Sequence, residues 1–241
     1  GLTLPLPVTE FEVAYGPDLI VELVNNSPEK VTLVGMASMI DLALAIQQDP
    51  GIIENIAQVV IMGGAFTVSG NLHEGPEPTD NIAAEWNMYI DPEAAHLLFT
   101  SGVPLTVIPL DAIQYLVQPE DVAVLNSIGG PGVDYVAGMW NQQNEWAGGA
   151  GFLIWDTITI TAVTNPENFS WTYDGVDVVT EPGDFQGQTI PLHNGAVHSR
   201  YATDADYEAI LELLFTTYRE GSLPPSSPAM EADNSITSLG G

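Results

Sequence analysis

The sequence predicts an α/β fold, an open and mainly parallel sheet with helices on both faces. Short runs of β-branched apolar residues alternate with helical segments of about ten residues, which is typical of βαβ units. These runs are apolar without polar alternation, as expected for strands that are covered on both sides. Pro and Gly residues separate most of the segments, so the ends of the predicted strands and helices can be assigned from the sequence.

The first half of the chain contains the clearest elements. We predict buried parallel strands at residues 31–36 (VTLVGM), 58–62 (QVVIM) and 103–110 (VPLTVIPL). Helices are expected at residues 39–48 and 91–100. The second of these helices has defined ends, because Asp91 is a suitable N-cap, Pro92 suits the first helical position and Gly102 follows the last turn.

The second half is less regular, and its expected elements are a helix at 133–146, short strands at 175–179 and 188–190, and a last helix at 205–218 capped by Thr203 or Asp204. Residues 153–163 (LIWDTITITAV) fit either a strand or a helix, since periodicity does not separate the two in a short apolar run. We expect residues 1–221 to form the folded domain and the Ser/Pro/Gly-rich residues 222–241 to be a disordered tail.

The charge balance excludes several classes of function. The 241 residues include 32 acidic and only 3 basic side chains, for a net charge of −29. Because Lys30, Arg200 and Arg219 are the only cations, binding to nucleic acid or to an anionic membrane surface is not expected. The acids are spread along the chain, which favours a solvating coat over a binding patch. This coat and the absence of cysteine fit a salt-rich cytoplasm and secretion equally, so the compartment stays open.

A long loop at residues 64–84 is the best position for a binding site. It follows the predicted strand 58–62, and ligands of open parallel sheets bind at the carboxyl ends of strands. Glu85 and Asn87 flank Trp86 where the loop ends. If this segment is extended, both polar side chains can face one ligand, and the alternative is ordinary capping of a helix.

Asp156 is a second candidate, because a carboxylate inside an apolar run needs a partner. With so few cations in the chain, the partner is either a metal ion, for which oxygen ligands favour Ca²⁺ or Mg²⁺, or the first turn of a helix that Asp156 caps. The histidines (His73, His96, His193 and His198) lack metal-ligand spacing and are interpreted as surface or structural residues.

Several segments in order resemble the inosine-uridine-preferring nucleoside hydrolase family. Residues 31–46 (VTLVGMASMIDLALAI) resemble its strand–loop–helix V-T-L-V-A-x-G-P-L-T-N-x-A-L-A-L, and residues 59–65 (VVIMGGA) resemble I-V-x-M-G-G-A. Gly70-Asn71 with residues 84–95 (AEWNMYIDPEAA) resemble its G-N and A-E-F/W-N-x-x-x-D-P-E-A-A blocks. Residues 102–112 and 152–163 follow in the family's order.

The resemblance implies roles for individual residues. Asn71, Glu85 and Asn87 match residues that hold the ribose hydroxyls, and Met62 matches the methionine beside the ribose. Trp155 stands where purine-preferring members stack a tryptophan on the base, so it is the expected leaving-group residue and the substrate is expected to be a purine nucleoside. The family's reaction is assisted by Ca²⁺. Two further positions match ligands of that ion, and these are the carboxylate of Asp156 and the main-chain carbonyl of Ile40.

One hallmark of the family does not occur in this sequence. The N-terminal D-x-D-x-x-x-D-D cluster, which supplies most Ca²⁺ ligands and the general base, has no counterpart, so we expect the first βα unit to be absent. Two hypotheses remain. In the first, the chain is part of an N-glycosidase that hydrolyses ribonucleosides, its missing aspartates come from a preceding segment or a separate chain, and the chain alone is inactive. In the second, the chain is a non-catalytic homologue that binds a nucleoside or sugar. The resemblance also implies homo-oligomerisation of the full-length protein.

Overall fold

A five-stranded sheet forms the centre of the larger of two units into which the chain divides. The computed structural model describes residues 13–72, 79–193 and 199–221. The larger unit contains the described residues between 13 and 117 and between 152 and 207. The tail predicted at residues 222–241 lies outside the described residues.

The sheet has the strand order β1-β2-β3-β7-β4 and is mainly parallel, as predicted. β1 (Val31–Gly35), β2 (Ile56–Met62) and β3 (Leu105–Ile108) pair in parallel, and β7 (Ser199–Ala205) continues parallel to β3. β4 (Phe169–Tyr173) adds an antiparallel strand beside β7. A separate two-stranded sheet joins β5 (Val176–Val178) to β6 (Thr189–Pro191).

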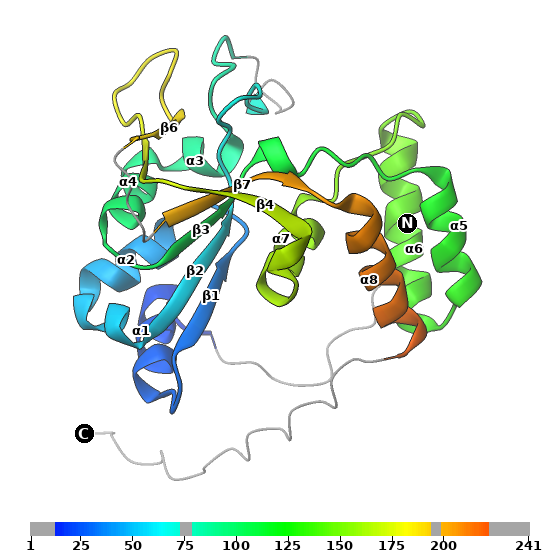
Figure 1. Cartoon of the computed structure of the whole chain (residues 1–241), viewed down its shortest axis with the longest axis horizontal. Helices are drawn as coiled ribbons and strands as arrows, with labels where there is room; N and C mark the ends of the chain where they lie inside the picture. The colour runs from blue at the N-terminus through cyan, green and yellow to red at the C-terminus, as the bar shows by residue number, and fades with distance from the viewer. Residues whose placement is uncertain (1–12, 73–78, 194–198, 222–241) are drawn as a thin grey trace. The chain divides into compact units, whose positions relative to one another are not determined.

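Helices cover both faces of the sheet, as predicted (Figure 1). On one face, α1 (Gly16–Asn26), α2 (Ile40–Gln48), α3 (Trp86–Ile90) and α4 (Pro92–Thr100) enclose a core that includes residues of β2 and β3. On the other face, α7 (Trp155–Thr164) packs against β2. Short 3₁₀ turns are η1 (Pro50–Asn55), η3 (Leu110–Ala112) and η4 (Pro166–Asn168).

The ends of α4 follow from its sequence. The side chain of Asp91 accepts a hydrogen bond from the Ala94 backbone N–H at 2.9 Å, which satisfies one free donor of the first turn. Pro92 occupies the first helical position, and Gly102 follows the helix with φ of +83°. The predicted helix at residues 91–100 is therefore confirmed, with the predicted cap.

The end of the sheet differs from the prediction. Thr203 and Asp204 do not cap the last helix, because both lie in β7, and α8 (Tyr207–Arg219) begins after that strand. Pairing with β3 and β4 on both sides keeps residues 199–205 extended. Since those partners come from distant parts of the sequence, local capping chemistry gave the wrong boundary.

β1 is an edge strand, and this corrects the prediction that residues 31–36 form a buried strand. Among the described residues β1 pairs with β2 alone, and all five of its residues are half-buried. Val31 and Leu33 pack against the core cluster. Within the described residues, this edge of the sheet is apolar and its outer backbone groups have no strand partner, which makes it a site for unwanted strand pairing.

We expect a lysine at this edge to suppress association. The substitution Val34→Lys should lower the fluorescence of a bound hydrophobic dye by about twofold or more, because a charged edge side chain discourages strand addition. Asn26→Lys, at the exposed end of α1, adds the same charge elsewhere and is the control. Dye fluorescence and sedimentation of the two variants measure the effect. Equal dye binding by both variants would show that the edge is not the adhesive surface.

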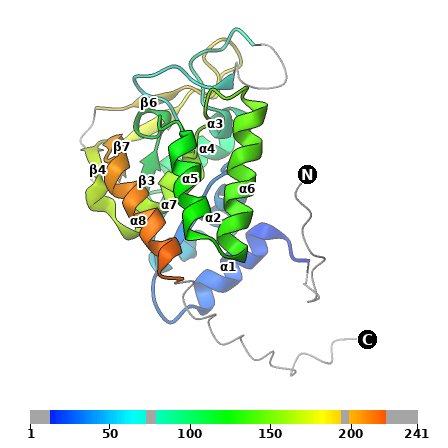
Figure 2. The ribbon, with the colours of Figure 1, turned by 90° about the vertical axis from the view of Figure 1, so that its right-hand side faces the viewer.

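The smaller unit is helical and contains α5 (Pro119–Ile128), α6 (Pro131–Trp146) and α8 from Glu208 onward. α5 and α6 run alongside each other (Figure 2). Its buried apolar residues include Leu125, Trp140 and Ile210. The predicted helix at 133–146 is confirmed, whereas α5 was not predicted. Within the described ranges, the search for a helix long and apolar enough to cross a membrane finds none.

Candidate functional site

The polar residues singled out in the sequence meet where β2 ends. β2 ends at Met62, and Gly63 and Gly64 lead into the long loop. The Gly63 N–H donates to the Ile108 carbonyl at the end of β3, and the Leu110 N–H donates to the Gly64 carbonyl. These bonds fix the start of the loop at the carboxyl end of two parallel strands, which is where open α/β sheets bind ligands.

Glu85 is a buried carboxyl group at this position. Its side chain is 1% exposed and accepts hydrogen bonds from the backbone N–H groups of Gly64 at 3.1 Å, Asn87 at 3.0 Å and Met88 at 3.3 Å. Burial raises the pKa of Glu85 to about 7, and the nearby negative charge of Asp156 adds to this increase, while the three backbone donors oppose it. Glu85 therefore changes its charge near neutral pH.

Glu85 is also the N-cap of α3, so residues 85–87 are not extended. Of the two interpretations from the sequence, capping of a helix describes this segment. The turn nevertheless brings Asn87 back to the end of β2, where its Nδ2 donates to the carbonyl oxygen and to the sulfur of Met62, each at 3.1 Å. Because both contacts use Nδ2, they leave Oδ1 of Asn87 as an acceptor.

Asn71 is positioned by a close approach of two backbone segments. Its Oδ1 accepts from the Trp86 N–H at 2.8 Å, which leaves Nδ2 as a donor. At the preceding Gly70 the N–H donates to the Ile82 carbonyl at 2.7 Å. A Cβ atom at Gly70 would lie 1.8 Å from the Ala84 carbonyl oxygen, so glycine is required there. The Gly-Asn pair and the Glu85 turn thus hold each other in place.

Trp155 shares a cavity with Asn71. The cavity holds about 210 Å³ and is lined by Val68, Ser69, Gly70, Asn71, Leu110, Gln114, Leu153 and Trp155. The indole N–H of Trp155 is buried and has no hydrogen-bond partner among the residues that the structure describes. The loop after β2 and the start of α7, which are far apart in sequence, therefore meet around one cavity.

Residues 153–163 adopt the helical alternative, since α7 spans Trp155–Thr164. The N-cap position belongs to Ile154, and Asp156 lies inside the first turn without a capping hydrogen bond. The interpretation of Asp156 as a cap for a helix beginning at Thr157 is therefore wrong. Burial raises the pKa of Asp156, and its charge acts on Glu85, which places the two carboxyl groups in one electrostatic site.

The described residues do not form a Ca²⁺ site by themselves. No group of three or more His, Cys, Asp or Glu side chains suited to a metal ion occurs in the described part of the chain. Ile40 is the first residue of α2, and its side chain lines a different surface groove, between α2 and α4. Ca²⁺ takes six to eight oxygen ligands, and Asp156 with one carbonyl leaves most of them to be supplied.

Sequence reasoning missed three residues that shape the site. Asp111 accepts from the backbone N–H groups of Phe66 at 2.8 Å and Thr67 at 2.7 Å, which anchors the loop. Thr189 on β6 donates to the Ala65 carbonyl and accepts from its N–H, both at 2.9 Å. Gln114 lines the cavity. The position of Asp111 directly after a predicted strand was an available signal, whereas nothing local marks Thr189.

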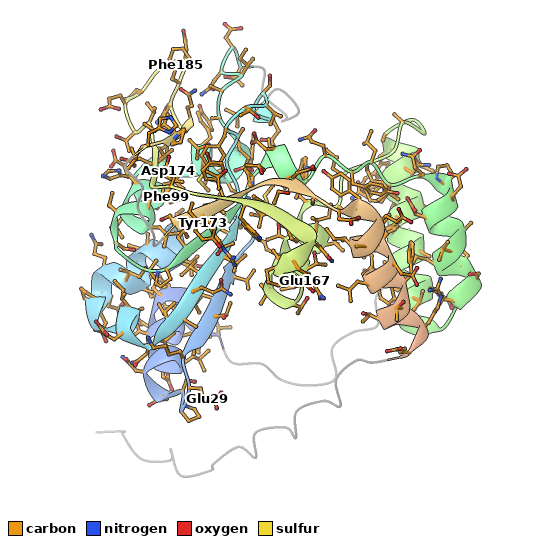
Figure 3. All side chains as sticks on the ribbon, viewed as in Figure 1. Glu29, Phe99, Glu167, Tyr173, Asp174 and Phe185 are labelled. Carbon is orange, nitrogen blue, oxygen red and sulfur yellow. The ribbon has the colours of Figure 1, made fainter. Side chains whose placement is uncertain are left out.

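The histidines that the structure describes have structural partners, as predicted. Nδ1 of His96 on α4 lies 2.6 Å from Asp177 Oδ1 on β5. Nδ1 of His193 lies 3.2 Å from Oδ2 of Asp174, a residue that Figure 3 labels. His73 and His198 lie outside the described residues.

Known proteins with similar sequences identify the family of the chain. The chain is 31% identical over 225 residues to the pyrimidine-specific ribonucleoside hydrolase RihA of Klebsiella pneumoniae, covering 89% of this chain and 69% of the relative. It is 29% identical over 195 residues to probable uridine nucleosidase 1 of rice (Oryza sativa), covering 79% of this chain and 57% of the relative. The chain thus spans between about half and two thirds of these relatives' length.

The fold itself matches solved structures. A purine-preferring ribonucleoside hydrolase from Gardnerella vaginalis superposes with a TM-score of 0.80 at 24% identity, over 91% of this chain and 70% of that chain. A nucleoside hydrolase from Bacillus anthracis gives a TM-score of 0.76 at 23% identity, over 88% of this chain and 68% of that chain. A family model described as inosine-uridine preferring nucleoside hydrolase matches residues 3–212. The chain therefore belongs to the inosine-uridine preferring nucleoside hydrolase family.

Proposed function

We propose that this chain carries the sugar- and base-binding part of an N-glycosidase that hydrolyses purine ribonucleosides to ribose and free base. One observation carries the proposal: the Asn71, Glu85 and Asn87 side chains converge at the end of β2 beside a cavity that contains Trp155. Family membership supports the reaction class, since relatives are ribonucleoside hydrolases and nucleosidases.

The unused polar atoms suit the hydroxyl groups of a ribose. Nδ2 of Asn71 can donate and Oδ1 of Asn87 can accept, because the opposite ends of both amides are occupied. The carboxyl group of Glu85 lies between the backbone donors that fix it. Cleavage of an N-glycosidic bond passes through an oxocarbenium-like state, so amides and a carboxylate that hold the sugar most tightly in that state lower the barrier.

Trp155 is the proposed contact for the base. Its side chain lines the cavity that Asn71 also lines, so a sugar held by Asn71 places the base within the same cavity. An indole face attracts a purine that gains positive charge as it takes up a proton, which favours departure of the base. We propose purine selectivity on this ground, although named relatives include pyrimidine-specific enzymes.

Hydrolysis requires further carboxylates in this proposal. Asp156 is the one side-chain Ca²⁺ ligand proposed within the described residues, and Ile40 offers a main-chain carbonyl alone. We therefore propose that the chain by itself binds nucleosides without hydrolysing them. The second hypothesis, a non-catalytic nucleoside-binding protein, makes the same prediction for the isolated chain. Sequencing the gene upstream of Gly1 distinguishes the two hypotheses. An aspartate cluster encoded there supports the hydrolase, and its absence supports the binding protein.

Calorimetry with inosine and uridine tests the binding proposal. We expect inosine to bind more tightly than uridine, and Trp155→Ala to weaken inosine binding by about tenfold or more through loss of stacking. Trp155→Phe keeps a smaller aromatic face and should lose less affinity, which separates stacking from a general change of shape. Tighter binding of uridine would refute purine selectivity, and rapid hydrolysis of inosine by the chain alone would refute the need for further carboxylates.

A further inference from the structure

Arg200 lines a cavity at the opposite end of the sheet from the proposed nucleoside site. The cavity holds about 300 Å³ and is lined by Ala57, Gln58, Pro104, Leu105, Thr106, Tyr173, Ser199 and Arg200. Residues 57–58, 104–106 and 199–200 lie at the starts of β2, β3 and β7. The parallel strands therefore expose their amino ends here, whereas the Glu85 site lies at their carboxyl ends.

The guanidinium of Arg200 is held in a fixed orientation, and no acidic side chain of the described residues pairs with it. It lies 4.1 Å above the ring of Trp171, and its Nε donates to Oγ1 of Thr106 at 3.0 Å. Among the ion pairs of the described residues, none involves Arg200. In a chain with 32 acids and 3 bases, a cation that contacts an aromatic ring and a hydroxyl instead of a carboxylate is unexpected.

The nearest acid along the adjoining chain has other partners. Asp174 follows Tyr173, which ends β4 and is paired with Arg200 in the strand register. The carboxylate of Asp174 is 5% exposed and accepts from the backbone N–H groups of Gly175 and His193, each at 2.9 Å. No acidic residue is among those that line the cavity.

A chain of hydrogen bonds determines which groups the cavity offers. Thr106 accepts from Arg200 Nε and donates to Oε1 of Gln58 at 3.3 Å. The amide oxygen of Gln58 is therefore occupied, and its Nε2 is left as a donor. Since Nε of Arg200 is also occupied, the terminal Nη1 and Nη2 edge remains, and this edge matches the two oxygens of one carboxylate. The hydroxyl groups of Ser199 and Tyr173 add two possible donors.

We propose that this cavity binds a small organic carboxylate, with its two oxygens on the Nη edge of Arg200 and its apolar body against Ala57 and Pro104. The donor set accounts for the anionic group, and the two apolar residues account for an organic body rather than an inorganic ion. The stacked and hydrogen-bonded guanidinium is preorganised, which lowers the entropy cost of binding. This site is independent of the proposed nucleoside function.

Titration of the full chain with benzoate at constant ionic strength tests the proposal. We expect saturable binding, which calorimetry and the side-chain NMR signals of Arg200 and Trp171 both measure. Arg200→Met should weaken binding by about tenfold or more, because the Nη1 and Nη2 donors of the guanidinium are lost. Acetate should bind more weakly than benzoate, since it lacks the apolar body. Inorganic phosphate that displaces benzoate with equal affinity would overturn the assignment to a carboxylate.

A second variant guards against misfolding, since Arg200→Met also removes the contact with Trp171. Gln58→Glu places a carboxylate inside the cavity and leaves the Arg200 stack intact, so we expect it to abolish benzoate binding while preserving the melting temperature. Gln47→Glu, at an exposed position of α2, makes the same charge change elsewhere and should bind benzoate like the unaltered chain. Unchanged binding in Gln58→Glu, or no saturable binding by the unaltered chain, would refute the proposal.

Discussion

Replacing Glu85 by glutamine is expected to remove a large pH dependence from the stability of the protein. The folded state holds the proton of Glu85 up to about pH 7, whereas an unfolded glutamate releases it near its ordinary pKa of 4.5. The folded state thus binds more protons between these values, so the contribution is fully present below pH 4.5 and is lost as pH rises through 7. This interval corresponds to roughly 3 kcal/mol of unfolding free energy.

Denaturant unfolding from pH 4 to pH 8.5 measures the effect as a difference between Glu85→Gln and the unaltered chain. The variant should gain relative stability as pH rises, because it never ionises. Its amide nitrogen cannot accept a backbone hydrogen bond, which subtracts about 1 kcal/mol at every pH. Glu93→Gln, at an exposed position of α4, makes the same charge change and serves as the control. Parallel pH profiles for Glu85→Gln and the unaltered chain would contradict the raised pKa.

The same substitution tests the proposed grip on the sugar. A carboxylate accepts a hydrogen bond from a ribose hydroxyl more strongly than a neutral carboxamide does. We therefore expect the inosine affinity of the unaltered chain to increase as pH rises through about 7, where Glu85 becomes a carboxylate. The affinity of Glu85→Gln should be weaker above pH 7 and should not change with pH in this range.

Replacing Gly70 by alanine is expected to cause the largest loss of stability among single methyl additions at the proposed nucleoside site. The new Cβ would lie 1.8 Å from the Ala84 carbonyl oxygen and 2.3 Å from its carbon, and backbone atoms cannot rotate away as a flexible side chain can. The loop must move, which breaks the Gly70–Ile82 backbone hydrogen bond and separates Asn71 from Trp86. We expect a loss of about 3 kcal/mol and no measurable binding of inosine.

Gly132→Ala in α6 is the matched control for this prediction. A Cβ there meets no atom within 4 Å, so alanine should stabilise that helix by about 0.5–1 kcal/mol. Thermal or denaturant unfolding of both variants gives the comparison. A Gly70→Ala protein that melts with the unaltered chain would show that the loop accommodates a side chain and that the Asn71 placement does not depend on glycine.

Much of the fold was predictable because its signals are local. The apolar β-branched runs at residues 31–36 and 58–62 form strands, and Asp91 with Pro92 begins a helix as its sequence indicates. Short-range hydrogen bonds and side-chain periodicity decide such elements, so a window of ten residues contains the necessary information. Strand β7 was missed because its extended conformation depends on pairing with β3 and β4 from distant parts of the chain.

The candidate site divides in the same way. The sequence by itself determined the family, through ordered motifs, and the identity of the candidate residues Met62, Asn71, Glu85, Asn87 and Trp155. Only the tertiary structure decided that Glu85 caps a helix while buried beside the charge of Asp156, and that Trp155 and Asn71 line one cavity. Burial and electrostatic environment arise from contacts between residues far apart in sequence, and a linear pattern does not specify them.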